Sequence, residues 1–258
     1  MVNIVKQVPQ VLSMIYGDLA QPGVRKVGIA LETVLEFSTS FLLPLKLQNE
    51  KFKLNFQKRL NEYKSKLEDV PEEDICEVNP QIGTPIVDKL SYTTNDEISD
   101  LFTNLLIKAS SIKNVNLAHP SFVQLIERLS IDEARIIKHI QNKDFIPSIS
   151  FRAFLKDGKG FYEALVNGTN LQFEVKLEFS ENIKTYLDNL TSMGILDISH
   201  GHYKMSEKNY ENLYLSYKYE ETKEKFMAPN GYEKFEISKS YYQITDFGKT
   251  FIKACNKT

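Results

Sequence analysis

Residues 24–47 read VRKVGIALETVLEFSTSFLLPLKL, and residues 48–69 continue as QNEKFKLNFQKRLNEYKSKLED. In the first stretch, apolar residues recur at helical spacing, namely Val27, Ala30, Leu31, Val34, Leu35, Phe41 and Leu42. The second stretch has the same spacing in Phe52, Phe56, Leu60, Tyr63 and Leu67. These patterns predict two amphipathic helices, over residues 24–43 and 45–67. Pro44 separates them, because proline lacks an N–H and its ring clashes with the preceding helical turn.

The apolar helix over residues 24–43 is nearly long enough to cross a membrane. A span needs roughly 20 mostly apolar residues, whereas residues 27–43 include both Glu32 and Glu36. Each carboxylate is costly at the centre of a bilayer. We therefore expect this helix to pack into a protein core. Association with a membrane surface is the next alternative, and a true span is the least favoured.

The second helix is strongly basic. Residues 46–66 hold seven basic side chains against Glu50 and Glu62, and six acidic residues follow in the connector 68–77. A basic amphipathic helix can lie on anionic lipid or nucleic acid. The alternative is a solvated face that the acidic connector neutralises. If the helix contacts a membrane or a partner, the predicted contact residues are Lys46, Lys51, Lys53, Lys58 and Arg59.

Helix signals continue to about residue 140. A helix start is expected at Pro9, a short helix over residues 84–90, and a capping box at Thr94 with Glu97. His119 precedes Pro120 at another helix start, where its ring can bond a free backbone group. Ser130 and Glu133 form a second capping box.

After residue 140 the pattern changes to strands. FIPSISFRAFL (145–155) and LQFEVKLEF (171–179) alternate or run apolar, with turn signals at residues 157–160 and 167–170. Ser180 is expected to cap a helix ending at Gly194, a hairpin is expected around Gly201, and Thr245 is expected to cap a closing helix. Residues 207–226 fit either a helix or an extended insert.

These elements predict an α+β protein with two modules. Residues 1–128 form a mainly helical module, and residues 129–258 form an elaborated winged-helix-like module with a strand insert near 145–179. Winged helices that read DNA need basic side chains on the recognition helix. Here that helix, residues 181–193, has a net charge of −1. Lys184 and Lys204 are the candidate DNA contacts, and a protein-contact or structural role is favoured over DNA.

No pattern for catalysis, metal or cofactor binding emerges. His200 and His202 lack further ligands at metal spacing, and the glycines of residues 157–160 lack the spacing of a phosphate loop. His139 lies among isoleucines on a helix. We expect no enzyme activity and no cofactor. Cys76 and Cys255 make no disulfide framework, the chain has a net charge of −2, and residues 1–14 lack the features of a signal peptide. A cytoplasmic location is expected.

Three segments together resemble the Abi-alpha family of bacterial abortive-infection proteins. They are LLPLKLQNEKFKLNFQKRLNEYKSKLEDVPEEDI (42–75), LAHPSFVQLIERLSIDEARIIKHI (117–140) and YYQITDFGKTFIKAC (241–255). The resemblance implies defence against phage, in which the infected cell stops growing or dies before phage is released. It supplies no catalytic residues.

The leading hypothesis is a non-enzymatic phage-defence protein. Its helix pair around Pro44 would be packed away at rest and released onto the inner membrane surface on infection. The expected partners are an unknown protein or phage trigger, together with peripheral membrane contact. The alternatives are a winged-helix DNA-binding regulator and a nucleic-acid-degrading toxin without a recognisable motif. Oligomeric state, homo-oligomers included, stays open.

Overall fold

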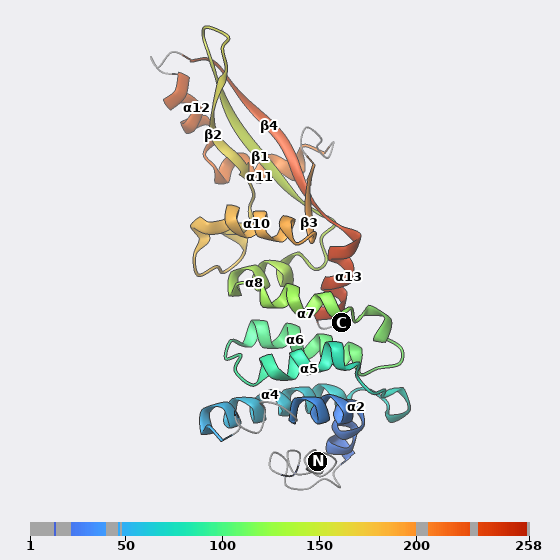
Figure 1. Cartoon of the computed structure of the whole chain (residues 1–258). Helices are drawn as coiled ribbons and strands as arrows, with labels where there is room; N and C mark the ends of the chain where they lie inside the picture. Colours follow the sequence, from blue (N-terminus) through green and yellow to red (C-terminus); the bar gives the residue numbers. More distant parts are fainter. Residues whose placement is uncertain are drawn as a thin grey trace. The chain divides into compact units, whose positions relative to one another are not determined.

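The structure is a computed structural model that describes Ser13, residues 22–39, Lys46, and residues 48–199, 206–227 and 232–256. It has an α+β fold (Figure 1). The chain divides into two compact units, residues 1–134 with 250–258, and residues 135–249. The sequence-based boundary between residues 128 and 129 stays a prediction.

The first unit is helical. Its helices are α2 (Pro22–Thr39), α4 (Glu50–Glu68), α5 (Pro80–Leu90), α6 (Asp96–Ala109) and α7 (Pro120–Glu127), with short 3-10 turns η2 (Glu72–Asp74) and η3 (Val115–Leu117). Helix α8 (Ile131–Ile140) runs from this unit into the second, and α13 (Asp246–Cys255) returns the chain to the first. Phe251 of α13 packs edge-on against Phe122 of α7, with ring centroids 5.3 Å apart.

Helix α2 is a core element, as expected. Its apolar side is fully buried through residues that include Val27, Leu31, Val34 and Leu35, each 0% exposed. This side packs against α4 and α5. Within the described parts of the chain, no helix is both long and apolar enough to cross a bilayer. The Pro44 break and the helix expected from Pro9 lie outside the described residues.

Helix α5 approaches α2 closely because Gly83 has no side chain. A Cβ at this position would lie 2.3 Å from Cγ2 of Val34 and 2.9 Å from Cγ1 of Val78. Both distances are far below van der Waals contact. Glycine therefore sets the spacing of the two helices.

One expected helix start and one expected cap differ from the structure here, and three expected caps are confirmed. Helix α5 starts at Pro80, earlier than predicted, because the Asn79 side chain accepts from the N–H of Gln81. Helix α6 is capped by Asn95, not by Thr94, since the Asn95 side chain accepts from the N–H of Ile98. Confirmed are the reciprocal Ser130–Glu133 box, the His119 ring accepting from the N–H of Ser121, and Thr245 accepting from the N–H of Gly248.

The second unit is built on a four-stranded antiparallel sheet of order β2-β1-β4-β3. The strands are β1 (Phe145–Leu155), β2 (Phe161–Gly168), β3 (Leu196–Ser199) and β4 (Tyr232–Ile244). Strands β1 and β4 pair along their length, with Ser150 opposite Ser238. The predicted turn between β1 and β2 is confirmed, and Gly158 adopts a φ of +66° there.

Residues 207–226, which the sequence left open, fold mostly as helices. Helix α11 (Lys208–Ser216) packs on β1, and α12 (Tyr219–Met227) packs on β4. Tyr210 and Leu213 of α11 are buried with Phe151 of the sheet, and aromatic residues such as Phe226 border this cluster. The helices form because they cover the sheet with an apolar side.

Two further predictions in this unit were wrong. Residues 171–179 are not a strand. They contain the short helix α9 (Leu171–Glu174), and Phe173 is 56% exposed, so the alternating pattern does not face a core. No side-chain cap bond is present at η4 (Ser180–Asn182) or α10 (Ile183–Ser192), and Ser180 therefore does not cap this helix. Strand β2 was missed.

A winged-helix module is not confirmed. The expected hairpin would join β3 to the next residues of the chain, but β3 pairs with β4. Helices α11 and α12 lie between these two strands in the sequence. The hairpin tip at Gly201 lies outside the described residues.

The close approach of α5 to α2 gives the first prediction. Gly83→Ala should lower the free energy of unfolding by about 1–3 kcal/mol, the usual cost of overpacking a core. Urea denaturation of this variant, of Val34→Ala and of the double variant measures the effect. The double variant should lose less than the sum of the two single losses, because Val34→Ala removes the methyl group that the new Cβ meets. Strictly additive losses would contradict this contact.

Candidate functional site

Four of the five predicted contact residues lie on α4. The side of this helix that faces α5 and α6, which we call its inner side, binds the loop between those two helices. The Nδ2 of Asn55 donates to the carbonyl oxygens of Leu90 (3.0 Å) and Ser91 (3.2 Å). Tyr63, two turns further along α4, shares a hydrogen bond with Ser110 at 2.6 Å. The last carbonyls of a helix have no partner within that helix. Asn55 supplies one to the C-terminal end of α5.

Arg59 is the centre of this contact. Its guanidinium is 1% exposed, and its Nη2 donates to the carbonyl oxygen of Thr94 at 2.9 Å. Its Nη1 lies 3.0 Å from Oε2 of Glu62 and 2.8 Å from Oδ1 of Asp96. Its Nε donates to the carbonyl oxygen of Thr93 at 3.3 Å. Every nitrogen of the guanidinium therefore has a partner, as a buried charge requires.

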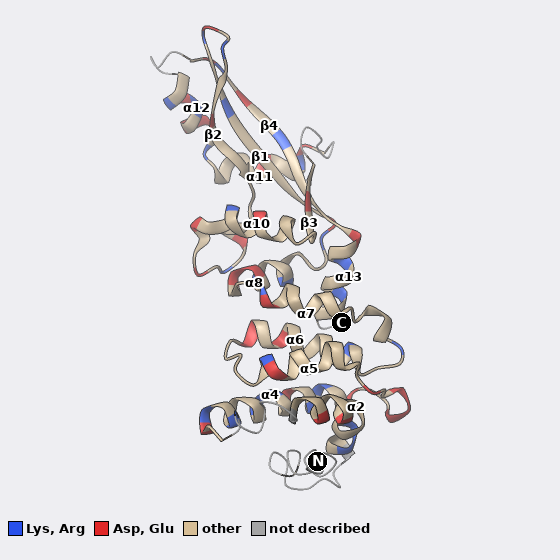
Figure 2. Cartoon of the chain, viewed as in Figure 1, with Lys and Arg blue, Asp and Glu red and all other residues tan. Residues whose placement is uncertain are grey.

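Three lysines, one before α4 and two on it, also pair with carboxylates of α5 and α6. Lys46 pairs with Asp88 of α5, Lys58 lies 2.9 Å from Asp96 of α6, and Lys66 lies 2.9 Å from Asp100 of α6. Figure 2 shows basic residues along α4 and acidic residues where α5 ends and α6 begins. These three lysines are thus paired with carboxylates inside the same unit.

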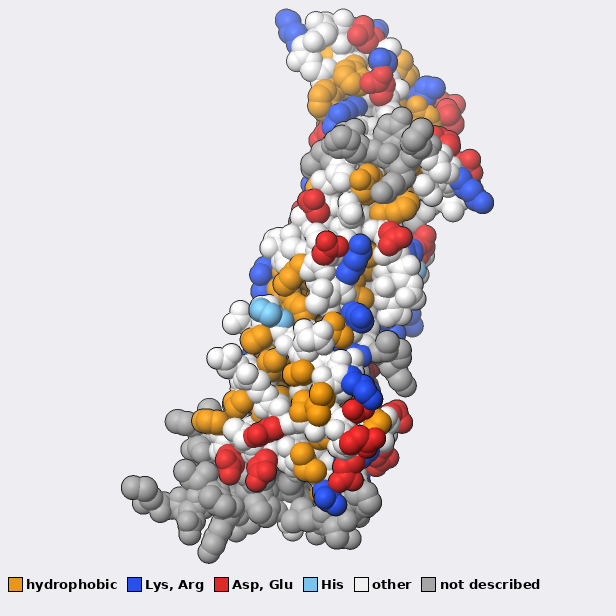
Figure 3. All heavy atoms as spheres, turned by 90° about the vertical axis from the view of Figure 1, so that its right-hand side faces the viewer, with side chains coloured by type: hydrophobic (Ala, Val, Ile, Leu, Met, Phe, Trp, Pro, Cys, Tyr) orange, Lys and Arg blue, Asp and Glu red, His pale blue; other side chains and the backbone are white. Residues whose placement is uncertain are grey.

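The acidic connector after α4 has other partners. Glu72 pairs with Arg25 of α2 at 3.3 Å, and Asp74 pairs with Lys113. Figure 3 shows acidic side chains gathered near the lower end of one face of the molecule, where this connector lies. The prediction that this connector neutralises the basic helix was wrong for Lys46, Lys58 and Lys66, whose carboxylates come from α5 and α6.

The outer side of α4 is exposed. Lys51 and Lys58 lie on it, and Leu54 between them is 62% exposed. Lys51 also borders a shallow hollow of about 110 Å³ beside Tyr92. Lys53, which is 4.0 Å from Glu50, is only partly exposed. We call Lys51, Leu54 and Lys58 the outer face of α4.

The structure therefore separates the five predicted contact residues. Lys51 and Lys58 reach solvent, Lys46 and Lys53 are partly covered, and Arg59 is buried. Sequence analysis missed Asn55 and Leu54. Asn55 lies four residues before Arg59, the spacing that places two side chains on one helix side. That spacing was the available signal, whereas the exposure of Leu54 depends on the packing of α4.

The structure describes one of the two candidate DNA contacts. Lys184 is exposed on α10, and Lys204 lies outside the described residues. Elsewhere in this unit, the ring Nε2 of His139 lies 3.0 Å from Oε2 of Glu174, which also accepts from Lys143 at 3.0 Å. Among the described residues, no group of three or more His, Cys, Asp or Glu side chains is arranged to hold a metal ion.

The comparisons with known proteins now identify the family. The sequence model of Abi_alpha, described as abortive infection alpha, matches residues 48–255. The chain belongs to the abortive infection alpha family. The matched range includes all of α4 and its partners on α5 and α6. Membership suggests a role in abortive infection, a form of defence against phage.

One solved structure is similar, and it comes from the marine bacterium Alcanivorax borkumensis SK2. It is described as an uncharacterized protein from this hydrocarbon-degrading organism and shares 14% identity with the abortive infection alpha chain. The alignment covers 55% of this chain and 94% of that one, with a TM-score of 0.34. No curated protein matches the chain.

The burial of Arg59 gives the second prediction. Arg59→Met should lower the free energy of unfolding by about 1–3 kcal/mol, because it removes the charge-assisted hydrogen bonds of the guanidinium to Thr94, Glu62 and Asp96. Lys58→Met, which removes the neighbouring exposed ion pair, should change the free energy of unfolding by at most about 1 kcal/mol. Urea denaturation measures both. Equal effects of the two substitutions would show that Arg59 does not hold α4 in place.

The pH dependence of the same contact gives the third prediction. Hydrogen bonds from Lys58 and Arg59 lower the pKa of Asp96 from its ordinary 3.8. A lowered carboxylate pKa stabilises the fold above the unfolded pKa, and this stabilisation disappears as the pH falls through the folded pKa. The urea midpoint of the wild type should therefore exceed that of Asp96→Asn at pH 6 and approach it below pH 3.8.

Glu97→Gln is the matched control for Asp96→Asn, because Glu97 lies in the same first turn of α6. It accounts for the interaction of an acidic residue with the helix dipole. If Glu97→Gln reproduces the pH profile of Asp96→Asn, the stabilisation comes from the dipole and not from Arg59 and Lys58.

Proposed function

We propose that this chain is a non-enzymatic phage-defence protein whose effector element is α4. On infection, the basic outer side of this helix contacts the inner surface of the membrane. The observation that carries the proposal is the outer face itself. Leu54 is 62% exposed between Lys51 and Lys58. Lysines on the polar side and an apolar residue that can enter the headgroup region are features shared with helices that lie at a membrane surface.

The energies favour contact in place over release of the helix pair. Releasing α2 would expose Leu31, Leu35 and other buried side chains, at about 1.5–3 kcal/mol each. The sum is comparable with the whole stability of a typical protein, about 5–15 kcal/mol. The outer face of α4 already reaches solvent and needs no such opening. We therefore propose that α2 keeps its position and Arg59 keeps α4 docked.

The exposed lysines can exchange their partners at little cost. A solvent-exposed ion pair such as Lys58 with Asp96 contributes about 0–1 kcal/mol. A lysine near an anionic membrane surface gains about 1 kcal/mol. Lipid phosphates can therefore replace the Asp96 carboxylate as the partner of Lys58, and Lys51 can join them. Infection would shift this balance by bringing a protein partner or phage component to the N-terminal unit.

The fourth prediction tests this contact. The double variant Lys51→Glu and Lys58→Glu should bind phosphatidylglycerol–phosphatidylethanolamine vesicles at least about tenfold more weakly than the wild type, since it reverses two charges that each contribute about 1 kcal/mol. The same variant should lose protection against phage in a plaque assay. Vesicle flotation and plaque counts measure the two effects, and circular dichroism checks the fold.

The matched control is Lys138→Glu with Lys184→Glu, which reverses two exposed lysines of the second unit. It should retain both vesicle binding and protection. Protection that survives intact in the α4 variant would overturn the membrane proposal. Degradation of nucleic acid in cells that express the wild-type protein would overturn the non-enzymatic part. Loss of salt-dependent DNA retention in the control variant would instead favour the DNA-binding alternative.

A further inference from the structure

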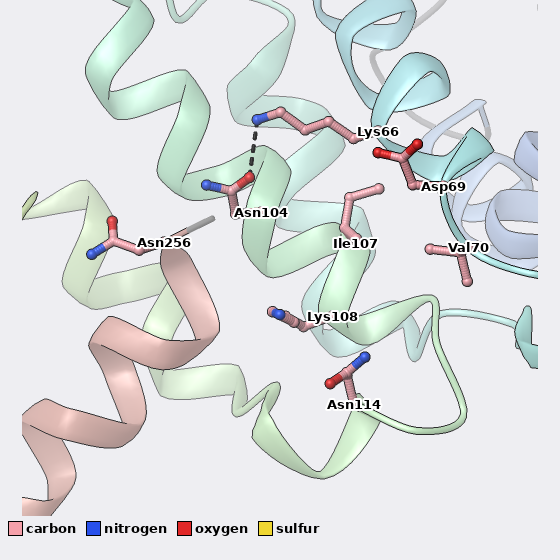
Figure 4. Close-up of a pocket in the computed structure, with 8 residues that line it drawn as sticks. All are labelled: Lys66, Asp69, Val70, Asn104, Ile107, Lys108, Asn114 and Asn256. Carbon is pink, nitrogen blue, oxygen red and sulfur yellow. Dashed lines mark hydrogen bonds between the residues drawn. The ribbon is translucent and has the colours of Figure 1, made fainter. Parts of the chain in front are cut away.

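A separate pocket, lined by charged, amide and apolar side chains, lies in the N-terminal unit, where α4 ends beside α6. Its volume is about 200 Å³. Figure 4 shows Lys66 and Asp69 from the end of α4, with Asn104 and Lys108 from α6 and Asn114 from the loop that follows. None of these residues belongs to the outer face of α4. The pocket is thus independent of the proposed membrane contact.

One wall of the pocket is fixed by hydrogen bonds. The Nζ of Lys66 donates to Oδ1 of Asn104 at 2.9 Å, and it lies 2.9 Å from Oδ1 of Asp100. Asn104 is 9% exposed, and its Nδ2 donates to the carbonyl oxygen of Cys255 at 2.9 Å. These bonds define the orientation of the Asn104 amide and hold the Lys66 ammonium. An ammonium has three hydrogens, so Lys66 retains donor capacity after these two contacts.

Lys108 adds a second positive charge to the pocket. Burial, and then the nearby charge of Lys253, lower the pKa of Lys108. Both effects act against the charged form of the side chain. An anion in the pocket would offset them, because it would attract Lys108 and reduce its repulsion from Lys253. At Lys108, the electrostatics therefore favour a negatively charged group of the ligand.

Asp69 and Asn114 indicate the rest of such a ligand. Asp69 brings a carboxylate to the pocket, and it would oppose a ligand that is anionic throughout. The Nδ2 of Asn114 donates to Oγ of Ser111 at 3.2 Å, and its Oδ1 is an acceptor. These two acceptors suit hydroxyl groups. A ligand with a phosphate at one end and hydroxyls at the other matches both sets of residues.

We propose that this pocket binds a small phosphomonoester that carries hydroxyl groups. The phosphate accepts from the ammonium group of Lys66, whose charge Asp100 partly neutralises, and from that of Lys108. The hydroxyls donate to Asp69 and Asn114. The volume admits a ligand of the size of glycerol phosphate, and lysine is a common binder of phosphate as a point charge.

Isothermal titration calorimetry with inorganic phosphate and with glycerol 3-phosphate tests the proposal, at constant ionic strength set with potassium chloride. The wild type should bind both, and glycerol 3-phosphate more tightly. Lys108→Met should bind glycerol 3-phosphate about tenfold more weakly or worse, the usual effect of removing a charged hydrogen-bond donor. Lys138→Met is the matched control, because Lys138, like Lys108, lies in the last turn of its helix.

A second variant keeps the lysines and changes the other side of the pocket. Asn114→Asp adds a negative charge and should also weaken binding of both ligands. Urea denaturation of the variants separates loss of binding from loss of folding. Binding that is equal in the wild type and Lys108→Met would overturn the proposal. The same holds if phosphate and its ester bind no better than chloride.

Vesicles containing phosphatidic acid distinguish a soluble ligand from a lipid headgroup. The proposal expects Lys108→Met to leave vesicle binding unchanged while it loses glycerol 3-phosphate. A loss of vesicle binding, combined with no binding of the soluble ester by the wild type, would assign the pocket to a headgroup and overturn the soluble ligand. Failure of the membrane proposal leaves this result unaffected, since the outer-face variant retains Lys66 and Lys108.

Discussion

The buried guanidinium of Arg59 is the interaction on which the arrangement of the N-terminal helices depends. It joins α4 to carbonyl oxygens of the α5–α6 loop and to the carboxylates of Glu62 and Asp96. A buried charge is tolerated only with such complete pairing. Together with the buried apolar side of α4, these bonds fix the helix so that Lys51 and Leu54 remain exposed.

The charge of α4 therefore has two different uses. On the inner side, cations meet acids of α5 and α6 and hold helices together. On the outer side, Lys51, Leu54 and Lys58 are exposed, and Lys58 also pairs with Asp96. A count of basic residues along the sequence does not distinguish these two groups. Family membership indicates phage defence, and the membrane contact that we propose uses the second group.

The local pattern of the sequence was informative where neighbours in the chain decide the structure. The apolar spacing in α2 and α4 and the Ser130–Glu133 cap were predicted for this reason. Partners distant in the sequence were not predictable, because charge pattern alone does not say that Lys58 meets Asp96. Strand β2 was missed since its first residues, such as Phe161, are exposed at a sheet edge. The candidate phosphate pocket likewise joins residues from separate segments.

The return of α13 to the first unit has a consequence for synthesis on the ribosome. The amide of Asn104 bonds to the carbonyl of Cys255, a partner 151 residues later in the chain. Phe122 likewise contacts Phe251, which is translated much later. Contacts between such distant residues form late. The N-terminal unit thus emerges first but is completed only after the entire second unit has been translated, so an interrupted polypeptide contains α4 without a finished unit around it.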